Sequence, residues 1–396
     1  MSHISISWVR SHSYIGPKAK YLSRHNLHRG DILFARRGVQ ATGQSALVRD
    51  EEEGSICGTG AIRLRVKPEN NKIHTNFLSH VLMERTSREW LRHNAIGATM
   101  PNLNEGIIRR FVFFAPPFDE QVRIADFLDA FDDKIELNRR MNETLEQTAR
   151  AIFQDWFVDF GPTRAKMEGR ETYLAPEVWS EFPDKFDEDE LPCGWKRSSL
   201  DRILDINPSE RLPNGAVAPY LDMTSIPTTG PNADIPTVRP FKSGSKFRNG
   251  DTLFARITPC LENGKTAFVH NLPENTIGSG STEFIVLRSR SPVPAAVSYL
   301  IARDARFRSH AIQNMTGTSG RQRADTSALI RFEVAVPPLP RLWHLLDETI
   351  RPIFDRIAAA DRESRTLAAT RDFLLPKLMS GEIRVKDAET LAADVL

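Results

Sequence analysis

The chain has 396 residues, of which 40% are hydrophobic and 26% are charged, and its formal net charge is +2. This composition is typical of a globular protein with two or three domains, and it excludes a peptide-scale scaffold. No apolar run approaches the roughly 18 residues of a membrane span, and residues 1–10 lack the pattern of a signal peptide, so we expect a cytoplasmic protein.

The small net charge results from segments of opposite charge. Residues 1–115 contain 17 Lys and Arg against 9 Asp and Glu, and residues 191–335 contain 18 against 12. Residues 116–190, in contrast, contain 9 basic and 20 acidic residues. Because such asymmetry bears on binding partners, the two basic segments are candidates for binding a polyanion.

The two basic segments are related by an internal repeat. The pattern Gly-Asp-x-Leu-Phe-Ala-Arg occurs at residues 30–36 and again at residues 250–256, an offset of 220. Three further matches keep nearly the same offset: Gly58-Thr59-Gly60 with Gly278-Ser279-Gly280, Gly97 with Gly317, and Pro116-Pro117 with Pro337-Pro338. Since order and spacing are both kept, the two segments are predicted to form similar globular domains.

After the first Pro-Pro pair the apolar residues recur at alternating steps of four and three, which is the heptad pattern of a coiled-coil helix. This helix is predicted to start after Pro117, where Asp119 and Glu120 suit its positive end, and to stop by Gly161-Pro162. Its seam consists of Ile124, Leu128, Phe131, Ile135, Asn138, Asn142, Leu145, Ala149, Ile152 and Trp156.

The second copy continues in the same register, and its helix is predicted to bend or end near Pro376 and to be capped around Gly381. Such a stripe is usually the face of a helix packed on its own domain, but two matching stripes of this length favour a helix pair. At about 1.5 Å per residue, about 37 residues form a rod of roughly 55 Å. The second seam consists of Leu346, Ile350, Ile353, Ile357, Ala360, Ser364, Leu367, Arg371, Leu374 and Leu378.

The predicted fold class is therefore α+β, with two pseudo-repeated globular α/β domains separated by two long antiparallel coiled-coil helices. A pair of basic domains on such a helix pair is sized to bind two DNA half-sites, which lie about 34 Å apart on one face of the duplex. The predicted segments are a first domain, a central helix, an acidic linker, a second domain, a C-terminal helix and a tail, at residues 1–115, 116–162, 163–190, 191–335, 336–381 and 382–396.

No pattern typical of catalysis stands out. Asn207-Pro208-Ser209-Glu210 lacks the second proline and the aromatic ring of an amino-methyltransferase loop, so we interpret it as a turn. The acidic run at residues 184–190 lacks the lysine of a nuclease site and is interpreted as a solvated linker. Neither an ATP-binding loop nor a glycine-rich methyl-donor motif occurs. We expect no intrinsic enzymatic activity and no cofactor in this chain.

Metal binding is also not expected. Cys57, Cys193 and Cys260 lie far apart in the sequence, without the close spacing of zinc ligands, and the ten histidines show no metal-type pairing. We interpret the three cysteines as small buried hydrophobic residues.

Several segments resemble the specificity subunits of type I restriction-modification systems, and the similarity covers nearly the whole chain. Smaller matches are Pro116-Pro117 with Glu120-Gln121, and residues 374–381 at the end of the second helix. The most specific match resembles the central region of the family and consists of Ile152-Phe153-Gln154-Asp155-Trp156-Phe157-Val158-Asp159-Phe160-Gly161-Pro162, then Phe182-Pro183-Asp184 and Leu191-Pro192-Cys193-Gly194-Trp195.

The resemblance implies that residues 1–115 and 191–335 are target recognition domains, each reading one half of a bipartite site in double-stranded DNA. The helices would be the spacer and the platform for two modification (methyltransferase) subunits, which restriction (translocase and nuclease) subunits join. The resemblance also implies that the partner subunits methylate adenine and cleave DNA, and that S-adenosylmethionine, ATP and Mg are bound by those subunits.

Polar loops at matched places in the two copies are the candidates for DNA contact. One loop follows the repeated strand, and the other follows the matched glycine. The repeated residues themselves are interpreted as a turn and a buried strand, because a repeated residue cannot explain the reading of two different half-sites. Arg36 and Arg256 share that problem, so phosphate or structural roles are expected for them. The candidates are Arg36, Arg37, Gln40, Thr99, Asn102, Arg256, Thr258, Lys265, Arg321, Gln322 and Arg323.

Two other functions stay open. The chain could be a nucleic-acid-binding coiled-coil scaffold without sequence specificity, which a ratio of specific to random-sequence affinity would distinguish. A stand-alone nuclease would cleave DNA with magnesium, but neither basic domain contains a cluster of carboxylates.

The two copies differ at their beginning. The second copy opens with Leu191-Pro192-Cys193-Gly194-Trp195 and Pro219-Tyr220-Leu221-Asp222, and an offset of 220 places that opening before Met1. About 25 to 30 residues are thus expected to be missing from the first recognition domain, counting back from the repeat. Either the true start lies upstream, or the first domain folds without this element.

Overall fold

The computed structural model describes residues 23–393 except residues 39–40, 68, 98 and 319. The chain divides into two compact units, Met1–Leu137 with Glu363–Leu396, and Asn138–Arg362. The division falls inside both long helices, α5 (Phe118–Phe157) and α11 (Arg341–Ser380). Each unit therefore contains one globular domain together with a part of each long helix.

The domain of the first unit is built on an antiparallel sheet in which β1 (Ile32–Ala35) lies between β2 (Ser45–Leu47) and β3 (Ala61–Leu64). All four residues of β1 are buried, and α2 (Thr75–Met83) packs against β2. The remaining elements of this unit are η1 (Ser23–His25), η2 (Asp50–Glu52), α3 (Arg85–His93), α4 (Glu105–Ile108) and α12 (Val385–Ala393).

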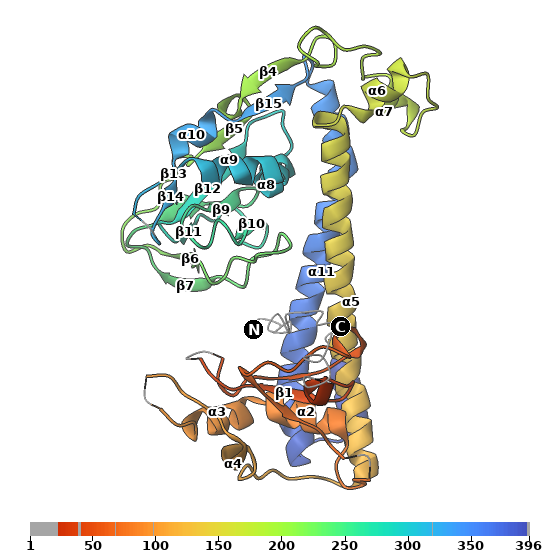
Figure 1. Ribbon diagram of the computed structural model, residues 1–396, viewed down its shortest axis with the longest axis vertical. Helices are drawn as coiled ribbons and strands as arrows, with labels where there is room; N and C mark the ends of the chain where they lie inside the picture. Colours follow the sequence, from red (N-terminus) through yellow and green to blue (C-terminus); the bar gives the residue numbers. More distant parts are fainter. Residues whose placement is uncertain (1–22, 39–40, 68, 98, 319, 394–396) are drawn as a thin grey trace. The chain divides into compact units, whose positions relative to one another are not determined.

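The domain of the second unit repeats this sheet and extends it. Its strands follow the order β10-β9-β12-β5, and α8 (Ala295–Arg303) packs against β10, β9 and β12 (Figure 1). The strands of this sheet are β5 (Leu204–Ile206), β9 (Thr252–Ala255), β10 (Thr266–Phe268) and β12 (Phe284–Ser289).

A second sheet, in the order β7-β6-β11-β8, and two short strand pairs complete that domain. The second sheet consists of β6 (Val217–Leu221), β7 (Thr237–Pro240), β8 (Ser245–Phe247) and β11 (Gly278–Gly280). The short pairs and remaining helices are β4 (Lys196–Ser199) with β15 (Glu333–Val336), β13 (Met315–Thr316) with β14 (Arg323–Ala324), η3 (Leu200–Arg202), α9 (Ala305–Gln313) and α10 (Thr326–Ile330).

The strand registers confirm the repeat. Ile32 of β1 lies opposite Leu47 and Leu64, and its equivalent Thr252 of β9 lies opposite Phe268 and Leu287. The helices α8 and α9 follow α2 and α3 at the offset of 220. The two copies thus share one arrangement of a central strand, two antiparallel neighbours and a helix pair.

In each unit a part of α5 lies alongside a part of α11 in antiparallel orientation (Figure 1). In the first unit Asp132 pairs with Arg371, and Lys134 pairs with Glu363 at 3.3 Å. In the second unit the Asn138 side chain donates to the carbonyl of Ala360 at 3.4 Å. Polar side chains therefore bond across the helix pair at seam positions and beside them.

Most of the predicted seam residues are buried. The exceptions are half-buried and are Asn142, Leu145, Ile152, Ile353, Ser364 and Arg371. The buried residues are Ile124, Leu128, Phe131, Ile135, Asn138, Ala149 and Trp156 in α5, and Leu346, Ile350, Ile357, Ala360, Leu367, Leu374 and Leu378 in α11. The α+β class and the long paired helices are confirmed.

The ends of both helices lie near their predicted positions. The first helix, α5, starts directly after Pro117 and ends at Phe157, before Gly161-Pro162. The second helix, α11, passes through Pro376 and ends at Ser380, and the predicted cap residue Gly381 follows it with a φ of +75°. A proline inside a helix costs about 3 kcal/mol, and burial of Leu374, Leu375 and Leu378 around it offsets that cost.

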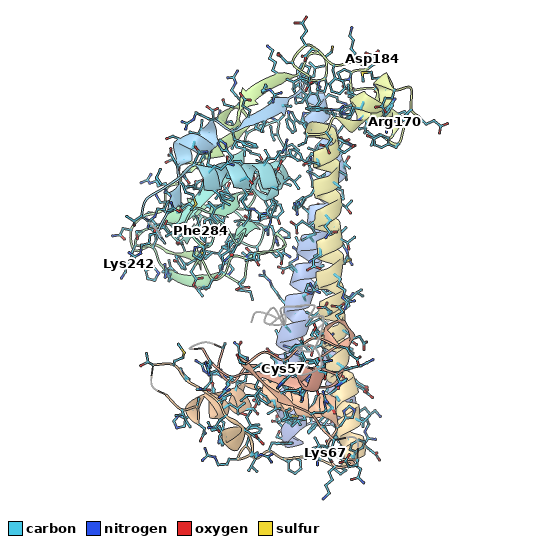
Figure 2. The ribbon with its side chains drawn as sticks, in the orientation of Figure 1. Cys57, Lys67, Arg170, Asp184, Lys242 and Phe284 are labelled. Carbon is cyan, nitrogen blue, oxygen red and sulfur yellow. The ribbon has the colours of Figure 1, made fainter. Side chains whose placement is uncertain are left out.

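The segments predicted as the acidic linker and the tail contain helices. The helix α6 (Gly161–Met167) begins just before the predicted linker, and α7 (Pro176–Trp179) lies within it. The ring of Phe182 packs edge-on against that of Trp156, with 5.5 Å between the ring centroids. The tail contains α12, whose Ala388 and Ala392 are buried in the core of the first unit. Charged linker residues such as Arg170 and Asp184 nevertheless project outward (Figure 2).

The cysteines correct a further expectation. Cys57, Cys193 and Cys260 are free thiols, and each is half-buried rather than buried, because each lies in a turn or loop and not in a core strand or helix. Burial raises the pKa of the Cys57 thiol, against the opposing charge of Arg63.

In the part of the chain that the structure describes, no helix is long and apolar enough to cross a membrane.

Candidate nucleic-acid interface

The repeated Gly-Asp motif forms the turn that leads into the central strand of each domain. Gly30 and Gly250 have φ angles of +87° and +90°, a left-handed conformation that glycine adopts at little steric cost. The strands that follow, β1 and β9, are buried at all four positions. The motif is therefore a structural element, and it determines where the loops after β1 and β9 begin.

Each Asp of the motif is buried and is held by an arginine of the neighbouring strand region. Asp31 accepts hydrogen bonds from Nε and Nη2 of Arg65 at 2.5 and 2.6 Å, and Asp251 accepts from Nε and Nη2 of Arg288 at 2.6 and 2.7 Å. Glu210 also contacts Arg288, at 2.7 Å. Arg288 is only 14% exposed, whereas Arg65 is 41% exposed.

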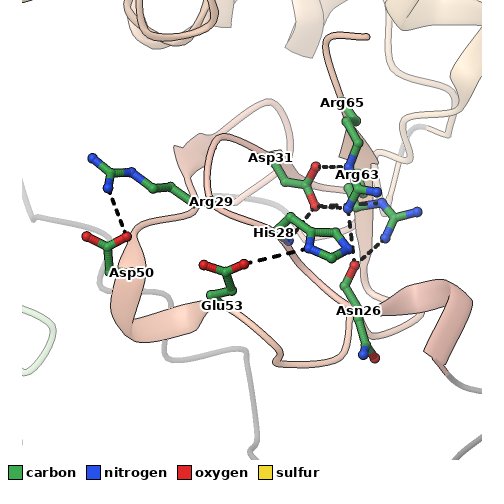
Figure 3. A network of polar contacts seen from close by, with 8 residues as sticks. All are labelled: Asn26, His28, Arg29, Asp31, Asp50, Glu53, Arg63 and Arg65. Carbon is green, nitrogen blue, oxygen red and sulfur yellow. Dashed lines mark hydrogen bonds and ion pairs between the residues drawn. The ribbon is translucent and has the colours of Figure 1, made fainter. Parts of the chain in front are cut away.

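Figure 3 shows the polar network around Asp31. Burial alone would raise the pKa of Asp31, but hydrogen bonds from Arg65 and from the backbone N–H of His28, together with the charges of Arg65 and Arg63, outweigh it and lower the pKa. Arg63 and Arg65 also donate to the backbone carbonyl of Asn26. The ionised carboxylate thus fixes the turn and the neighbouring strand to each other.

In the first domain this scaffold brings the two predicted loops together. Arg37 forms a β-bridge with Asn102, and Nε of Arg36 donates to Oδ1 of Asn102 at 3.3 Å. The Thr42 hydroxyl donates to the carbonyls of Gly38 and Pro101, at 2.7 and 3.0 Å. The loop after β1 and the loop after Gly97 therefore form one surface.

The second domain joins the equivalent loops in the same way. Ile257 forms a β-bridge with Arg323, and both N–H and Oγ1 of Thr258 donate to the carbonyl of Gln322, at 3.0 and 3.2 Å. The N–H of Ala324 donates to the carbonyl of Arg256 at 2.8 Å. Two loops far apart in sequence form one surface in each copy.

Several predicted residues hold this surface together. Arg36 bonds Asn102, Nη2 of Arg256 donates to the carbonyl of Ala324 at 3.4 Å, and Nζ of Lys265 donates to the carbonyl of Met223 at 2.6 Å. These contacts favour structural roles for Arg36, Arg256 and Lys265. The Nε of Arg256 is buried, and no described residue accepts a hydrogen bond from it.

Arg323 is also engaged. Its guanidinium donates to both carboxylate oxygens of Glu283, at 2.6 to 3.1 Å. The hydrogen bond from Arg323, against the opposing effect of burial, lowers the pKa of Glu283. The pair ties the second loop to the segment just before β12, which leaves Arg323 less free to contact bases.

The other predicted residues remain accessible. Arg37, Thr99 and Arg321 are exposed, and the side chain of Gln322 is half-buried. Gln40 lies outside the described residues. Side chains able to contact bases are therefore presented by both loop pairs.

A basic surface on the second sheet of the second domain was not predicted. The exposed strand β7 carries Arg239, whose guanidinium lies over the ring of Tyr220, and Lys242 follows it on the outside of the domain (Figure 2). The segment between β6 and β7 contacts the first sheet of this domain, because the N–H of Thr266 in β10 donates to the carbonyl of Pro227 at 3.1 Å. The density of basic residues between 239 and 248 was the signal in the sequence.

A buried arginine holds several backbone segments of the second domain together. Arg303, 8% exposed, donates to the carbonyls of Thr228, Gly264 and Thr266 at 2.8, 2.9 and 3.2 Å, and also to that of Gly230. A second network connects this arginine to the long helix, because Arg303 donates to the hydroxyl of Tyr299 and that hydroxyl donates to Glu146 of α5 at 2.7 Å.

The first domain is anchored to α5 by different side chains. Asp129 of α5 accepts from Asn76 at 2.6 Å and contacts Nε2 of His80 at 2.8 Å. Burial would raise the pKa of Asp129, but the bonds from His80 and Asn76 outweigh it and lower the pKa. Asp132 lies close enough to form a metal-type group with them, yet it already pairs with Arg371, so the cluster is an anchor between helices.

The comparisons with known proteins agree with the geometry. Residues 4–147 match the family model described as the type I restriction modification DNA specificity domain. The chain is 26% identical over 330 residues to the type I restriction enzyme MjaIX specificity subunit of Methanocaldococcus jannaschii, an alignment that covers 79% of this chain and 70% of that protein.

Two further similarities extend along most of the chain. It is 23% identical to the HindI specificity subunit of Haemophilus influenzae, over 90% of this chain and 87% of that protein. The crystal structure of a type I S subunit from M. genitalium aligns with a TM-score of 0.48 at 15% identity, over 90% of this chain and 84% of that one. The family model and the curated relatives agree that the proteins to which this chain is similar are specificity subunits of type I restriction enzymes.

Proposed function

We propose that this chain reads a bipartite site in double-stranded DNA, with one half-site bound by residues 1–115 and the other by residues 191–335. The proposal rests chiefly on one observation. The same pair of loops meets on the same scaffold in both domains, but the side chains that the loops present differ. They are Arg37 and Thr99 in the first domain, and Arg321 and the half-buried Gln322 in the second. A common scaffold with different loops suits two domains that read different sequences.

Electrostatics support the same function. Both domains carry a positive net charge, and phosphate contacts by Lys and Arg supply most of the affinity for any DNA sequence. Arg256 keeps its structural bond to the carbonyl of Ala324 through Nη2, and we assign its buried Nε–H, for which no described residue is an acceptor, to an oxygen of the DNA backbone. Arg36, Lys265 and Arg323 are then residues that shape the surface rather than read bases.

The proposed role of the helices is to set the spacing between the half-sites and to dock two modification subunits, to which restriction subunits are added. Specificity subunits are the non-catalytic components of type I systems. We therefore assign S-adenosylmethionine, ATP and Mg to those partners, and we propose the cytoplasm as the location of the complex. The segment bounds predicted from the sequence belong to this proposal.

The decisive experiment is co-expression of the chain with the methyltransferase subunit of the same system, followed by mapping of methylated adenines in the host DNA. The expected result is a two-part motif with a spacer of fixed length. An assembled complex that methylates no DNA, or that methylates without a motif, would contradict the proposal.

The competing function is a coiled-coil scaffold with non-selective DNA binding. The two functions differ in the ratio of affinities for the mapped motif and for random DNA at the same salt concentration. A sequence reader is expected to show a ratio of about 1000 or more, whereas a scaffold shows a ratio near one.

A further inference from the structure

Each recognition surface contains a hairpin around the matched glycine. In the first domain the backbones of Ile96 and Asn102 pair and exchange two hydrogen bonds, at 2.8 and 3.0 Å. In the second domain Thr316 of β13 lies opposite Arg323 of β14. Residues 97–101 connect the first pair and residues 317–322 connect the second, so the offset of the repeat changes from 220 to 221 within the hairpin.

The glycine of each hairpin identifies the equivalent residues on its far side. Gly97 and Gly317 have φ angles of +107° and +118°. A Cβ atom on Gly97 would lie 2.8 Å from the carbonyl oxygen of Met100, and one on Gly317 would lie 3.1 Å from the carbonyl oxygen of Arg321. Both glycines are therefore packed against the backbone of the same hairpin position.

The next residue of each hairpin confirms this alignment. The carbonyl of Pro101 accepts a hydrogen bond from the hydroxyl of Thr42 at 3.0 Å. The carbonyl of Gln322 accepts one from the hydroxyl of Thr258 at 3.2 Å. In both domains a threonine of the other loop thus holds this carbonyl, and the residue before it is the equivalent position.

Met100 and its equivalent Arg321 differ in chemistry. Both side chains are exposed, that of Met100 at 63%. Ile96 of the same hairpin is 62% exposed, and its equivalent is the exposed Thr316. The hairpin therefore presents apolar side chains in the first domain and polar side chains in the second.

The first surface has its exposed arginine on the other loop. Arg37 is exposed and forms the β-bridge to Asn102, whereas its equivalent Ile257 is half-buried. Each surface therefore presents an exposed arginine, on the loop after β1 in the first domain and on the hairpin in the second. Since a cation is kept in both domains, the apolar hairpin changes the contact to the bases and not the attraction to phosphates.

We propose that Met100 reads a thymine of one half-site through the methyl group of that base, at the hairpin position where Arg321 reads a guanine of the other. Thymine presents a methyl group in the major groove, whereas guanine presents two acceptors that suit a guanidinium. A methionine side chain adapts its shape to an apolar contact, and its thioether is only a weak acceptor. This inference rests on the proposed function, because it names the base that one residue of the surface contacts.

The test uses the assembled complex of the full chain with the modification subunit, bound to DNA that contains the mapped motif. Each thymine of the motif, on both strands, is replaced singly by uracil, which removes only the methyl group. Loss of the buried methyl group is expected to weaken binding about four-fold at one position. All affinities are measured at the same salt concentration.

The variant Met100→Ala is expected to weaken binding to the unmodified motif by a similar factor. It is also expected to abolish the difference between thymine and uracil at the sensitive position. Met100→Leu, which keeps an apolar side chain, is expected to retain part of that difference. Because Met100 is exposed, both variants should fold as the original chain does.

Arg321→Ala is the matched comparison at the equivalent position. It is expected to weaken binding but to leave the difference between thymine and uracil unchanged. Guanines are then replaced singly by 7-deazaguanine, which removes the N7 acceptor. One such replacement is expected to weaken binding through Arg321 and not through Met100, and to lie in the other half of the motif.

Three results would overturn the inference. The first is that no replacement of thymine by uracil weakens binding. The second is that Met100→Ala weakens binding to thymine and uracil DNA equally, because the side chain then acts on DNA shape or on folding. The third is that the positions sensitive to Met100 and Arg321 lie in the same half. In each case a two-part motif leaves the proposed function standing, whereas the absence of any motif contradicts both.

Discussion

The first and second recognition domains share a scaffold but differ in how deeply that scaffold is buried. In both, an aspartate after a left-handed glycine accepts two hydrogen bonds from an arginine. In the second domain, however, Glu210 joins the pair and the arginine is 14% exposed, against 41% in the first. The same motif therefore carries different energetic weight in two copies of one fold.

The largest effect is expected at Arg303, for which the first domain has Met83 at the equivalent position. The substitution Arg303→Met leaves Glu146 buried without its neighbouring positive charge and leaves backbone carbonyls without donors. We expect a loss of about 3–5 kcal/mol in the stability of the second domain. Hydrogen exchange of β9 and β10 measures this loss.

The control for that substitution is exchange of β1 and β2 in the same sample, which should not change. If Arg303→Met costs less than about 1 kcal/mol, the buried network does not hold the backbone segments of that domain together.

The next effect compares the two motif aspartates directly. Asp251→Asn is expected to destabilise the second domain by about 2–3 kcal/mol, because the arginine charge stays buried. Asp31→Asn is expected to cost the first domain about 1–2 kcal/mol, because Arg65 can turn toward solvent. Native-state hydrogen exchange of β9 and β1 gives both values, and equal losses would show that the difference in burial has no energetic consequence.

The third effect concerns DNA. Arg321→Ala is expected to weaken binding at one half-site by about 1–3 kcal/mol, and Arg37→Ala to do the same at the other, because each side chain is exposed on one surface. Footprinting of the assembled complex on its mapped motif separates the halves. Arg331→Ala, an exposed arginine outside the loops, is the control. Equal loss at both halves for either variant would contradict the assignment.

The smallest effect is the dependence on pH. The pKa of Asp31 and the pKa of Glu283 are lowered in the folded chain, so the unfolded chain binds more protons in acid. Their contribution to the free energy of unfolding is complete above the pKa values of the unfolded chain, about 3.9 for Asp and 4.3 for Glu. It is lost as the pH falls through the lower pKa values of the folded chain. Hydrogen exchange, measured in each domain across this pH range, should show that the free energy of unfolding decreases as the pH falls.

Asp31→Asn removes the first of these groups and should flatten the acid dependence of the first domain only. A dependence that is unchanged in this variant would mean that other carboxylates dominate the acid response.

The features that depend on local residue patterns can be predicted from the amino-acid sequence. The repeated Gly-Asp motif predicts a turn and a buried strand in each domain, because only glycine adopts the left-handed φ of Gly30 and Gly250 readily. The heptad spacing predicts the helix pair, since residues such as Ile124 and Leu374 must share one face of a helix. The matched loops also follow from the repeat, because both copies place them after the same elements.

Other features were decided by tertiary contacts between residues far apart in sequence. The arginines that hold Asp31 and Asp251 lie 34 and 37 residues further along the chain. Because these two separations differ by three residues, the offset of the repeat does not align the two arginines. Nothing local marks Arg303 as the residue that bonds four loop carbonyls, or shows that Arg323 is occupied by Glu283. Packing likewise outweighs local signals where α11 passes through Pro376 and where the tail folds as α12. The residue pattern along the chain specifies which face of a helix or strand is apolar. Which segment packs against that face, and which residue pairs with each buried charge, depends on contacts that form only in the folded chain.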